Sequence, residues 1–210
     1  MKRYKLYLFD FDGTLFDTFP ALEYTFERSY EEIGIQINKE DCKQYSREPL
    51  PDSYQRLGAD MDHFWDFVAI INRYLNSKES VELTRLYDDT LEFHKYVKDN
   101  NIAIGIVTSN NIPHIKEIYE NKGIDYSHFV VFVGNQEAQT PKPDPLPILT
   151  ALQLVKYDGD LKDVVYVGDS PNDSLAAERA GIDNYLLDRY HEFSDQPYKI
   201  IYSLMDLFKE

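Results

Sequence analysis

Short apolar segments recur along this chain and alternate with segments of helical periodicity. The apolar runs predict strands at residues 6–9, 102–107, 129–133, 164–167 and 184–187. Helical patterns lie between them at residues 89–98, 115–121, 146–155 and 175–180. Strands that are apolar throughout and alternate with helices are typical of a parallel sheet covered on both faces. The sequence therefore predicts the α/β fold class, with a doubly wound, Rossmann-like parallel sheet.

A block without strand patterns separates the first strand from the rest of the sheet. Two apolar stripes in it have helical spacing. The first consists of Phe19, Leu22, Phe26, Tyr30 and Ile33, and the second of Met61, Phe64, Trp65, Val68, Ile71 and Leu75. We therefore expect a core made of residues 1–16 and 86–210, with an inserted α-helical domain made of residues 17–85.

Composition narrows the classes of partner. The chain of 210 residues is 43% apolar and carries a formal net charge of −15. A chain this acidic, without a Lys/Arg cluster, binds nucleic acids and anionic membranes poorly, so neither is expected as a partner. The single cysteine, Cys42, excludes an intramolecular disulfide. No apolar leader precedes the first strand and no run approaches ~20 apolar residues, which favours a cytoplasmic protein.

The first strand ends in two aspartates one residue apart, Asp10 and Asp12, followed by Gly13. Side chains at positions i and i+2 of a strand point to the same side, so the two carboxylates would repel each other unless a cation lay between them. This arrangement suits a hard cation such as Mg²⁺ beside a carboxylate nucleophile. The alternative is an ordinary turn in which aspartate and glycine end a strand.

Polar residues also follow three later strands. They are Thr108, Ser109 and Asn110 after the second strand, Lys142 after the third, and Asp169 and Asp173 after the fourth. Ligands of parallel α/β sheets bind beyond the carboxyl ends of the strands. Local alternatives are a Ser or Asn helix N-cap, a solvated lysine, and a helix start with Ser170 as N-cap, Pro171 at N1 and Asp173 at N3. That helix start does not explain Asp169, whereas a metal site does.

Taken together, these strand ends resemble the motifs of the haloacid dehalogenase superfamily of hydrolases. The matching motifs are Asp10-Phe11-Asp12-Gly13-Thr14, then Thr108, then Lys142, and finally Gly168-Asp169-Ser170 with Asp173. One motif alone is unspecific, but the four in this order and spacing, over nearly the whole chain, are highly specific. The resemblance implies a Rossmann-like catalytic core, and the helical insert resembles the family's helical cap domain.

The resemblance also implies phosphate chemistry through an aspartyl-phosphate intermediate. Asp10 would be the nucleophile, and Asp12 would act first as general acid and then as general base. Mg²⁺ would be held by Asp10, the main-chain carbonyl of Asp12, and Asp169. Asp173 would be a second ligand or an outer-shell partner of the metal.

The phosphoryl group would be held by Thr108, the amide of Ser109, and Lys142, with Asn110 as a weaker candidate. The expected activity is Mg²⁺-dependent hydrolysis of a small phosphorylated metabolite of the phosphoglycolate or sugar-phosphate type. The sequence leaves the physiological substrate and the oligomeric state open.

Two alternatives remain. The first is a mutase resembling β-phosphoglucomutase, in which Arg47 of the cap loop would grip a second phosphate. Three residues depart from that pattern: Leu22 replaces a histidine, Asn111 replaces a lysine, and the fourth motif carries Asp173 in place of a Glu-Asp pair. The second alternative is a catalytically silent relative that binds a phospholigand, which the intact catalytic motifs disfavour.

Overall fold

The structure is a computed structural model that describes residues 2–38, 42, 50–138 and 140–209. The chain forms two compact units, each with its own hydrophobic core. We call Met1–Asp17 together with Leu86–Glu210 the core unit, and Thr18–Arg85 the helical unit. The chain therefore leaves the core unit after the first strand and returns to it before the second.

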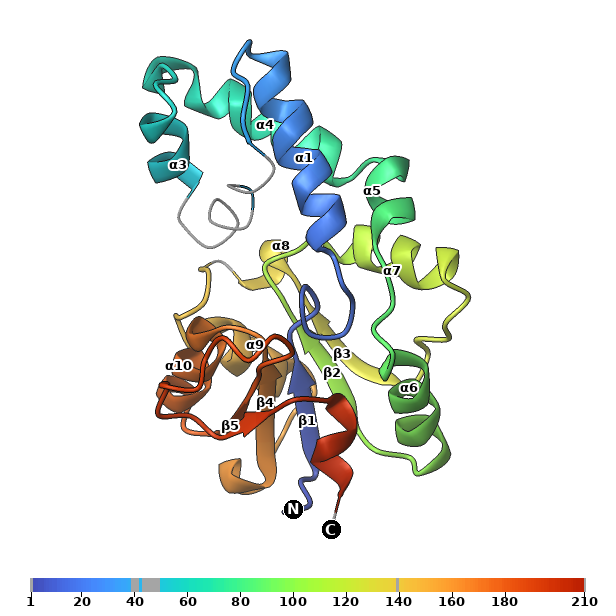
Figure 1. Ribbon diagram of the computed structural model, residues 1–210. Coiled ribbons are helices and arrows are strands. Elements are labelled where there is room, and N and C mark those ends of the chain that lie inside the picture. The colour runs from blue at the N-terminus through green and yellow to red at the C-terminus, as the bar shows by residue number, and fades with distance from the viewer. Residues whose placement is uncertain (1, 39–41, 43–49, 139, 210) are drawn as a thin grey trace. The chain divides into compact units, whose positions relative to one another are not determined.

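The core unit is built on a six-stranded parallel sheet with the strand order β3-β2-β1-β4-β5-β6 (Figure 1). The strands are β1 (Leu6–Phe9), β2 (Ile104–Val107), β3 (Phe129–Val133), β4 (Val164–Gly168), β5 (Asp183–Leu187) and β6 (Ile200–Ile201). The five predicted strands are confirmed, and β6 is an addition at the edge. Phe9 of the central strand pairs with Ile106 and with Val167, so β1, β2 and β4 end at the same edge of the sheet.

Both faces of the sheet are covered, because side chains of β1 alternate between them. Leu6 and Leu8 point to the face covered by α9 (Leu146–Leu154) and α10 (Pro171–Ala180), and they share one apolar cluster with these helices. This side is largely aliphatic, which suits close packing of helices on a parallel sheet. Helices also cover the other face of the sheet. The predicted doubly wound α/β fold is therefore confirmed.

The opposite face is aromatic. Phe9 packs against Phe93 of α6 (Thr90–Asp99), with ring centroids 5.1 Å apart, and Tyr119 of α7 (Ile112–Asn121) belongs to the same layer. The remaining helices of the core unit are short. They are α8 (Asn135–Ala138) and the 3₁₀ helices at Leu161–Asp163 and Leu204–Phe208. Across the described ranges, no helix has the length and apolar character needed to cross a membrane.

The helical unit contains no strand among its described residues. The helices among its described residues are α1 (Phe19–Glu32), α3 (Leu50–Arg56), α4 (Phe64–Leu75) and α5 (Lys78–Leu83), with a 3₁₀ turn at Met61–His63. The centre of this unit is the ring of Phe67, which lies 4.6 Å, between centroids, from the rings of Tyr30 and Tyr54. The stripe predicted on α1 is therefore buried through Phe26 and Tyr30.

The stripe predicted on α4 is partly wrong. Trp65 is 78% exposed and Met61 is 43% exposed, whereas Phe67, which was not assigned to the stripe, is 1% exposed. The buried side of the helix follows Phe64, Phe67 and Ile71, at spacings of three and four residues. This segment carries more apolar residues than one helix face can bury, so spacing alone did not identify the buried face.

A histidine lies inside the aromatic layer of the core unit. His94 of α6 is 5% exposed, and its ring contacts those of Phe16, Tyr119, His128 and Phe129. Burial, with a smaller contribution from His128, lowers the pKa of His94 from its ordinary value to about 3. The folded protein therefore holds this ring neutral at pH values where an unfolded chain would protonate it.

This neutral histidine should make the protein sensitive to acid. Below about pH 6.5 the unfolded chain takes up a proton at His94 that the folded chain refuses, so the free energy of unfolding falls as the pH falls towards 3. The loss should reach about 1.4 kcal/mol per pH unit in that window. In His94→Gln the group is absent, so the stability difference between wild type and variant should shrink with decreasing pH.

Urea unfolding at pH 7.5, 6 and 5 measures this difference. Phe9→Leu is the control, because it alters packing against Phe93 in the same aromatic layer without changing a titratable group, and its effect should be similar at each pH. Stability curves of wild type and His94→Gln that run parallel over this range would contradict the prediction.

A largely buried ion pair, between Arg189 and Asp89, holds both chain segments that lead to the helical unit. Arg189 lies 3.0 Å from Asp89 and donates to the carbonyl of Thr14 at 2.9 Å. Its guanidinium also stacks 3.8 Å from the ring centre of Tyr87. Asp89 additionally accepts a hydrogen bond from Ser203 at 2.7 Å. Arg189 thus connects the segment after β1 to the segment before α6, and Asp89 extends this connection to Ser203 in the C-terminal segment.

Removing this arginine should destabilise the core unit strongly. Arg189→Met leaves the largely buried Asp89 without its cationic partner, and we expect a loss of about 3 kcal/mol in the free energy of unfolding. Lys98→Met is the matched control, because its ion pair with Asp125 at 2.7 Å is exposed, and it should change stability little. Denaturant unfolding of both variants tests this, and equal effects would contradict it.

Candidate active site

The first strand ends in a compact turn that separates Asp10 from Asp12. The amide of Asp10 donates to the carbonyl of Val167 at 2.9 Å, which continues the pairing of β1 with β4. Phe11 is fully buried between the two aspartates, and its carbonyl accepts from the amide of Leu15 at 3.0 Å. Gly13 adopts a φ of 72°, which only glycine takes without strain.

The fourth strand leads directly into α10. Ser170 is the N-cap, Pro171 begins the helix, and Asp173 completes a capping box with Ser170, as predicted from the sequence. Asp169 lies between the strand and this cap. Gly168 has no room for a side chain, because a Cβ atom there would lie 2.3 Å from the carboxyl carbon of Asp173. The glycine therefore lets the helix start close to the sheet.

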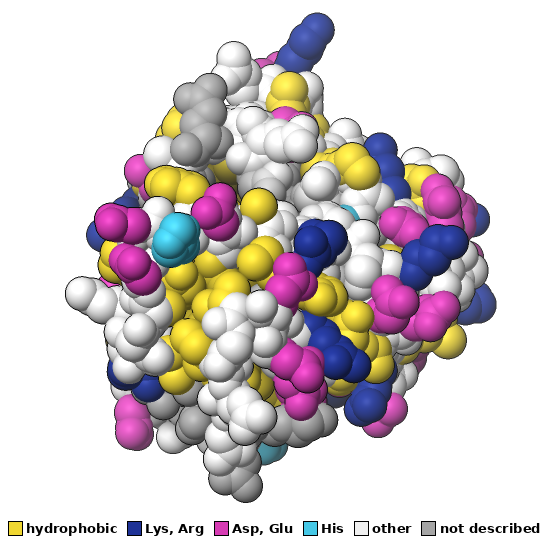
Figure 2. Space-filling model, turned by 90° about the horizontal axis from the view of Figure 1, so that it is seen from above, with side chains coloured by type: hydrophobic (Ala, Val, Ile, Leu, Met, Phe, Trp, Pro, Cys, Tyr) yellow, Lys and Arg dark blue, Asp and Glu magenta, His cyan; other side chains and the backbone are white. Residues whose placement is uncertain are grey.

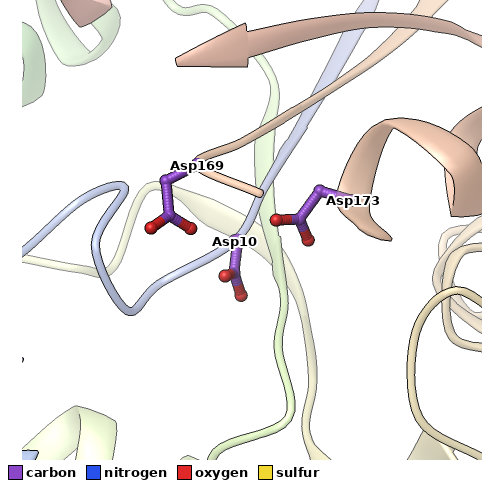
Figure 3. Close-up of side chains that lie close together, drawn as sticks. All are labelled: Asp10, Asp169 and Asp173. Atoms are coloured by element: carbon purple, nitrogen blue, oxygen red, sulfur yellow. The ribbon is translucent and has the colours of Figure 1, made fainter. Parts of the chain in front are cut away.

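Three carboxylates from these two strand ends converge. One oxygen each of Asp10, Asp169 and Asp173 lies within 4.8 Å of the others, and Figure 3 shows the three side chains around a common space. Asp12, the fourth predicted metal ligand, is not part of this carboxylate group. Its predicted contribution is the main-chain carbonyl, which the carboxylate positions do not test.

Lys142 is the cation of the site. It is almost fully buried, and its ammonium lies 2.8 Å from Asp10 and 2.5 Å from Asp173. It also donates to the hydroxyl of Tyr166 at 3.1 Å, and that hydroxyl donates to the carbonyl of Val107 at 2.6 Å. Burial alone would lower the pKa of Lys142, but Asp10 and Asp173 raise it well above its ordinary value. The lysine therefore remains charged.

One lysine does not balance this much negative charge. Burial is the largest effect on Asp10 and raises its pKa to about 7. The attraction of Lys142 opposes this rise, and repulsion from Asp173 and Asp12 adds to it. Burial also raises the pKa of Asp169 well above its ordinary value, and Asp173 and Asp10 add to this effect. All the carboxylates can be ionised together only if a further positive charge lies among them.

The donor set fits a divalent cation. Carboxylate oxygens are the ligands that hard cations prefer, and three of them, from two separate chain segments, already face one another. Gly13 contributes indirectly, because a Cβ atom at this position would lie 2.2 Å from a carboxylate oxygen of Asp169. The missing side chain of Gly13 therefore leaves space for the Asp169 carboxylate.

The second and third strands lead to a small pocket next to Lys142. It has a volume of about 180 Å³. It is lined by Thr108, Ser109, Asn135, Ala138, Thr140, Pro141, Lys142 and Pro147. Of the residues predicted to bind phosphate, Thr108, Ser109 and Lys142 are thus brought together. Arg47 lies outside the described residues.

Asn110 is placed differently from these three. Its side-chain amide nitrogen lies 3.2 Å from each carboxylate oxygen of Asp12. Asn110 itself is 8% exposed and does not line the pocket. The structure therefore places Asn110, which was predicted as a weaker phosphate ligand, against Asp12, the predicted general acid.

Sequence reasoning missed Tyr166, which joins Lys142 to the end of β2. Its only sequence signal is a hydroxyl-bearing residue inside an otherwise apolar strand, which needs a hydrogen-bond partner when it is buried. Asn135 and Thr140 of the pocket were also not singled out, because single polar residues at the start of a short helix or in a loop carry no distinctive pattern.

The positive charge at the site is local. On the face shown in Figure 2, the coloured Lys and Arg side chains lie singly or in small groups among Asp and Glu side chains. With a formal net charge of −15, long-range attraction of an anionic ligand is weak. An anion in the pocket must therefore be attracted mainly by Lys142 and by any cation held at the three carboxylates.

Comparisons with known proteins match both the sequence and the fold. A family model for haloacid dehalogenase-like hydrolases matches residues 7–186. A protein of Caldanaerobacter subterraneus subsp. tengcongensis that carries the name pyrophosphatase PpaX is 33% identical over 176 residues, which cover 83% of this chain and 77% of that protein. Phosphoglycolate phosphatase of Neisseria meningitidis is 30% identical over 183 residues, which cover 82% of this chain and 75% of the relative.

A crystal structure described as a haloacid dehalogenase-like hydrolase from Bacteroides fragilis superposes with a TM-score of 0.84 at 28% identity. The match covers 98% of this chain and all of the other. The resemblance inferred from the four sequence motifs is thereby confirmed: this chain belongs to the haloacid dehalogenase-like hydrolase family.

Proposed function

We propose that this protein is a Mg²⁺-dependent phosphatase that hydrolyses a small phosphorylated metabolite through an aspartyl-phosphate intermediate. The observation that carries the proposal is the convergence of Asp10, Asp169 and Asp173 beside the buried Lys142 at one edge of the sheet. The relatives support hydrolysis over a mutase, because the names of both relatives describe release of phosphate.

In the first step, a carboxylate oxygen of Asp10 attacks the phosphorus atom of the substrate. A bond between Asp10 and phosphorus forms while the bond from phosphorus to the leaving oxygen breaks. The leaving oxygen keeps the electron pair of that bond and takes a proton from Asp12. Lys142, at 2.8 Å from Asp10, balances charge on the oxygens of the transferred group.

In the second step, water attacks the phosphorus atom of the aspartyl-phosphate. Asp12, now ionised, takes a proton from this water, and the bond between phosphorus and Asp10 breaks. The electron pair returns to Asp10 as a carboxylate, and inorganic phosphate is released. Asp12 thus begins the next cycle protonated, and Asp10 begins it ionised.

Mg²⁺ would be held by the carboxylates of Asp10 and Asp169 and the main-chain carbonyl of Asp12, with Asp173 as a further or outer ligand. When bound, it supplies charge that relieves the repulsion between the carboxylates and the phosphoryl group. This role agrees with the raised pKa of Asp10 and of Asp169, which is caused first by burial and then by repulsion from the neighbouring carboxylates.

Groups that can donate to phosphoryl oxygens line the pocket. The hydroxyl oxygen of Thr108 accepts from the amide of Asn110 at 3.1 Å, so its own hydrogen can point to a ligand. Among the described residues, the amide of Ser109 has no acceptor. Thr108, the amide of Ser109 and Lys142 would therefore bind the phosphoryl group, and the volume of about 180 Å³ favours a small substrate.

We assign the helical unit, Thr18–Arg85, the role of the cap domain. Its described residues form an apolar cluster of their own, which suits a domain that moves as one body. A cap that closes during turnover would exclude bulk water and so protect the aspartyl-phosphate until the second step. The contribution of Arg47 to substrate binding stays a prediction.

Phosphate release from a panel of substrates tests the proposal. The panel contains phosphoglycolate, sugar phosphates including β-glucose 1-phosphate, p-nitrophenyl phosphate and pyrophosphate, each with Mg²⁺ and with EDTA. We expect release that depends on the metal. Conversion of β-glucose 1-phosphate to the 6-phosphate with little free phosphate would indicate the mutase, and no turnover of the panel would overturn the proposal.

Asp10→Asn should abolish turnover without unfolding the protein. An amide oxygen is a far poorer nucleophile than a carboxylate, so we expect kcat to fall by at least about 10³-fold. Thermal unfolding followed by circular dichroism checks that the fold persists. Turnover close to that of the wild type would exclude Asp10 as the nucleophile.

Gly13→Ala should weaken metal binding. The new Cβ atom would displace the carboxylate of Asp169, so the Mg²⁺ concentration that gives half-maximal activity should rise by about tenfold or more. Gly123→Ala is the matched control, because Gly123 also has a positive φ but no atom within 4 Å of an added Cβ. Titration calorimetry with Mg²⁺ gives a second readout. Equal metal affinities in the two variants would contradict the assignment of Asp169.

A further inference from the structure

Asn110 makes hydrogen bonds through each of its polar groups, and three of these bonds are to residues other than Asp12. Its amide donates to the hydroxyl of Thr108 at 3.1 Å, and its carbonyl accepts from the amide of Asn135 at 3.1 Å. Its side-chain oxygen accepts from the amide of Asn111 at 2.7 Å. These three bonds fix the residue in the segment between β2 and α7.

The hydrogen bond from Asn111 also determines which end of the Asn110 side chain faces Asp12. The oxygen must face the N–H of Asn111, so the NH₂ group points to the other side, where it meets the Asp12 carboxylate. The nitrogen lies 3.2 Å from both carboxylate oxygens. The two oxygens are thus contacted equally, which defines the rotation of the carboxylate.

Asp12 has few other restraints on its carboxylate. Within the described residues, Asn110 is the only group that donates a hydrogen bond to it. The backbone of Asp12 is fixed by the turn after β1, but its side chain is only partly buried. Without Asn110, the carboxylate could therefore turn among several rotamers, and a proton donor must keep its geometry to be effective.

We propose that Asn110 is a positioning residue that orients the carboxylate of Asp12 for proton transfer. This inference rests on the proposed function, in which Asp12 protonates the leaving oxygen. The NH₂ group can donate but not accept, so a protonated Asp12 cannot turn its proton towards Asn110. The proton is therefore left for the leaving oxygen. This role differs from binding phosphate, because Asn110 lies outside the residues that line the pocket.

Two substrates with different leaving groups separate these roles. Alkoxide is a poor leaving group that needs a proton, whereas p-nitrophenolate leaves without one. We compare an alkyl phosphate that the wild type hydrolyses with p-nitrophenyl phosphate, and measure kcat/KM, which includes departure of the leaving group. In Asn110→Ala we expect kcat/KM to fall about 30-fold or more for the alkyl phosphate, and no more than about threefold for p-nitrophenyl phosphate.

Asn111→Ala is the matched control. It removes a neighbouring amide of the same size but keeps the backbone N–H that Asn110 uses, and the side chain of Asn111 makes no cap hydrogen bond at the start of α7. Both substrates should be hydrolysed at nearly the wild-type rate. An equal fall in kcat/KM for both substrates in Asn110→Ala, or no fall for either, would overturn the inference.

A double-variant cycle covers the case in which Asn110→Ala alters folding. If Asn110 acts through Asp12, then Asp12→Ala with Asn110→Ala should hydrolyse the alkyl phosphate no more slowly than Asp12→Ala alone. Additive losses would overturn the inference. A wild type that hydrolyses neither substrate would instead refute the proposed function, so the two failures are distinguishable.

Discussion

Repulsion among carboxylates at one edge of the sheet is the constraint on which this structure depends. Asp10, Asp169 and Asp173 face one another across less than 5 Å, and Lys142 is the cation that the described residues place among them. Such a cluster is costly to bury unless it is paired. The fold accepts it because the ends of β1 and β4 and the first turn of α10 hold the three side chains, and the remaining negative charge makes the cluster a suitable site for a cation.

The sheet supplies this rigidity through its order. β1 lies between β2 and β4, so the segments that follow all three strands start within reach of one another. Tyr166 illustrates the coupling, because its hydroxyl contacts Lys142 and the last carbonyl of β2 at the same time. Groups from distant parts of the sequence are thereby fixed to a common frame, which enzymes need for precise placement of charge.

Much of this could be predicted from the sequence, because parallel strands and helix caps have strong local signals. The apolar strands and the capping box of Ser170 and Asp173 follow from residue type and spacing alone. β6 was missed because two residues form no pattern, and Trp65 was misplaced because α4 is apolar on more than one side. The contact of Asn110 with Asp12 joins residues 98 positions apart, and no local pattern carries that information.

Asp173 uses its two carboxylate oxygens for separate purposes. One accepts from the amide and hydroxyl of Ser170 and so starts α10, while the other pairs with Lys142. A search for more stable variants would therefore retain this residue even if activity were never assayed. Both the stability of α10 and the charge arrangement of the site require an aspartate here. A descendant that had lost its catalytic activity would therefore still tend to retain Asp173. The presence of an aspartate at this position is for that reason weaker proof of catalysis than the presence of Asp10.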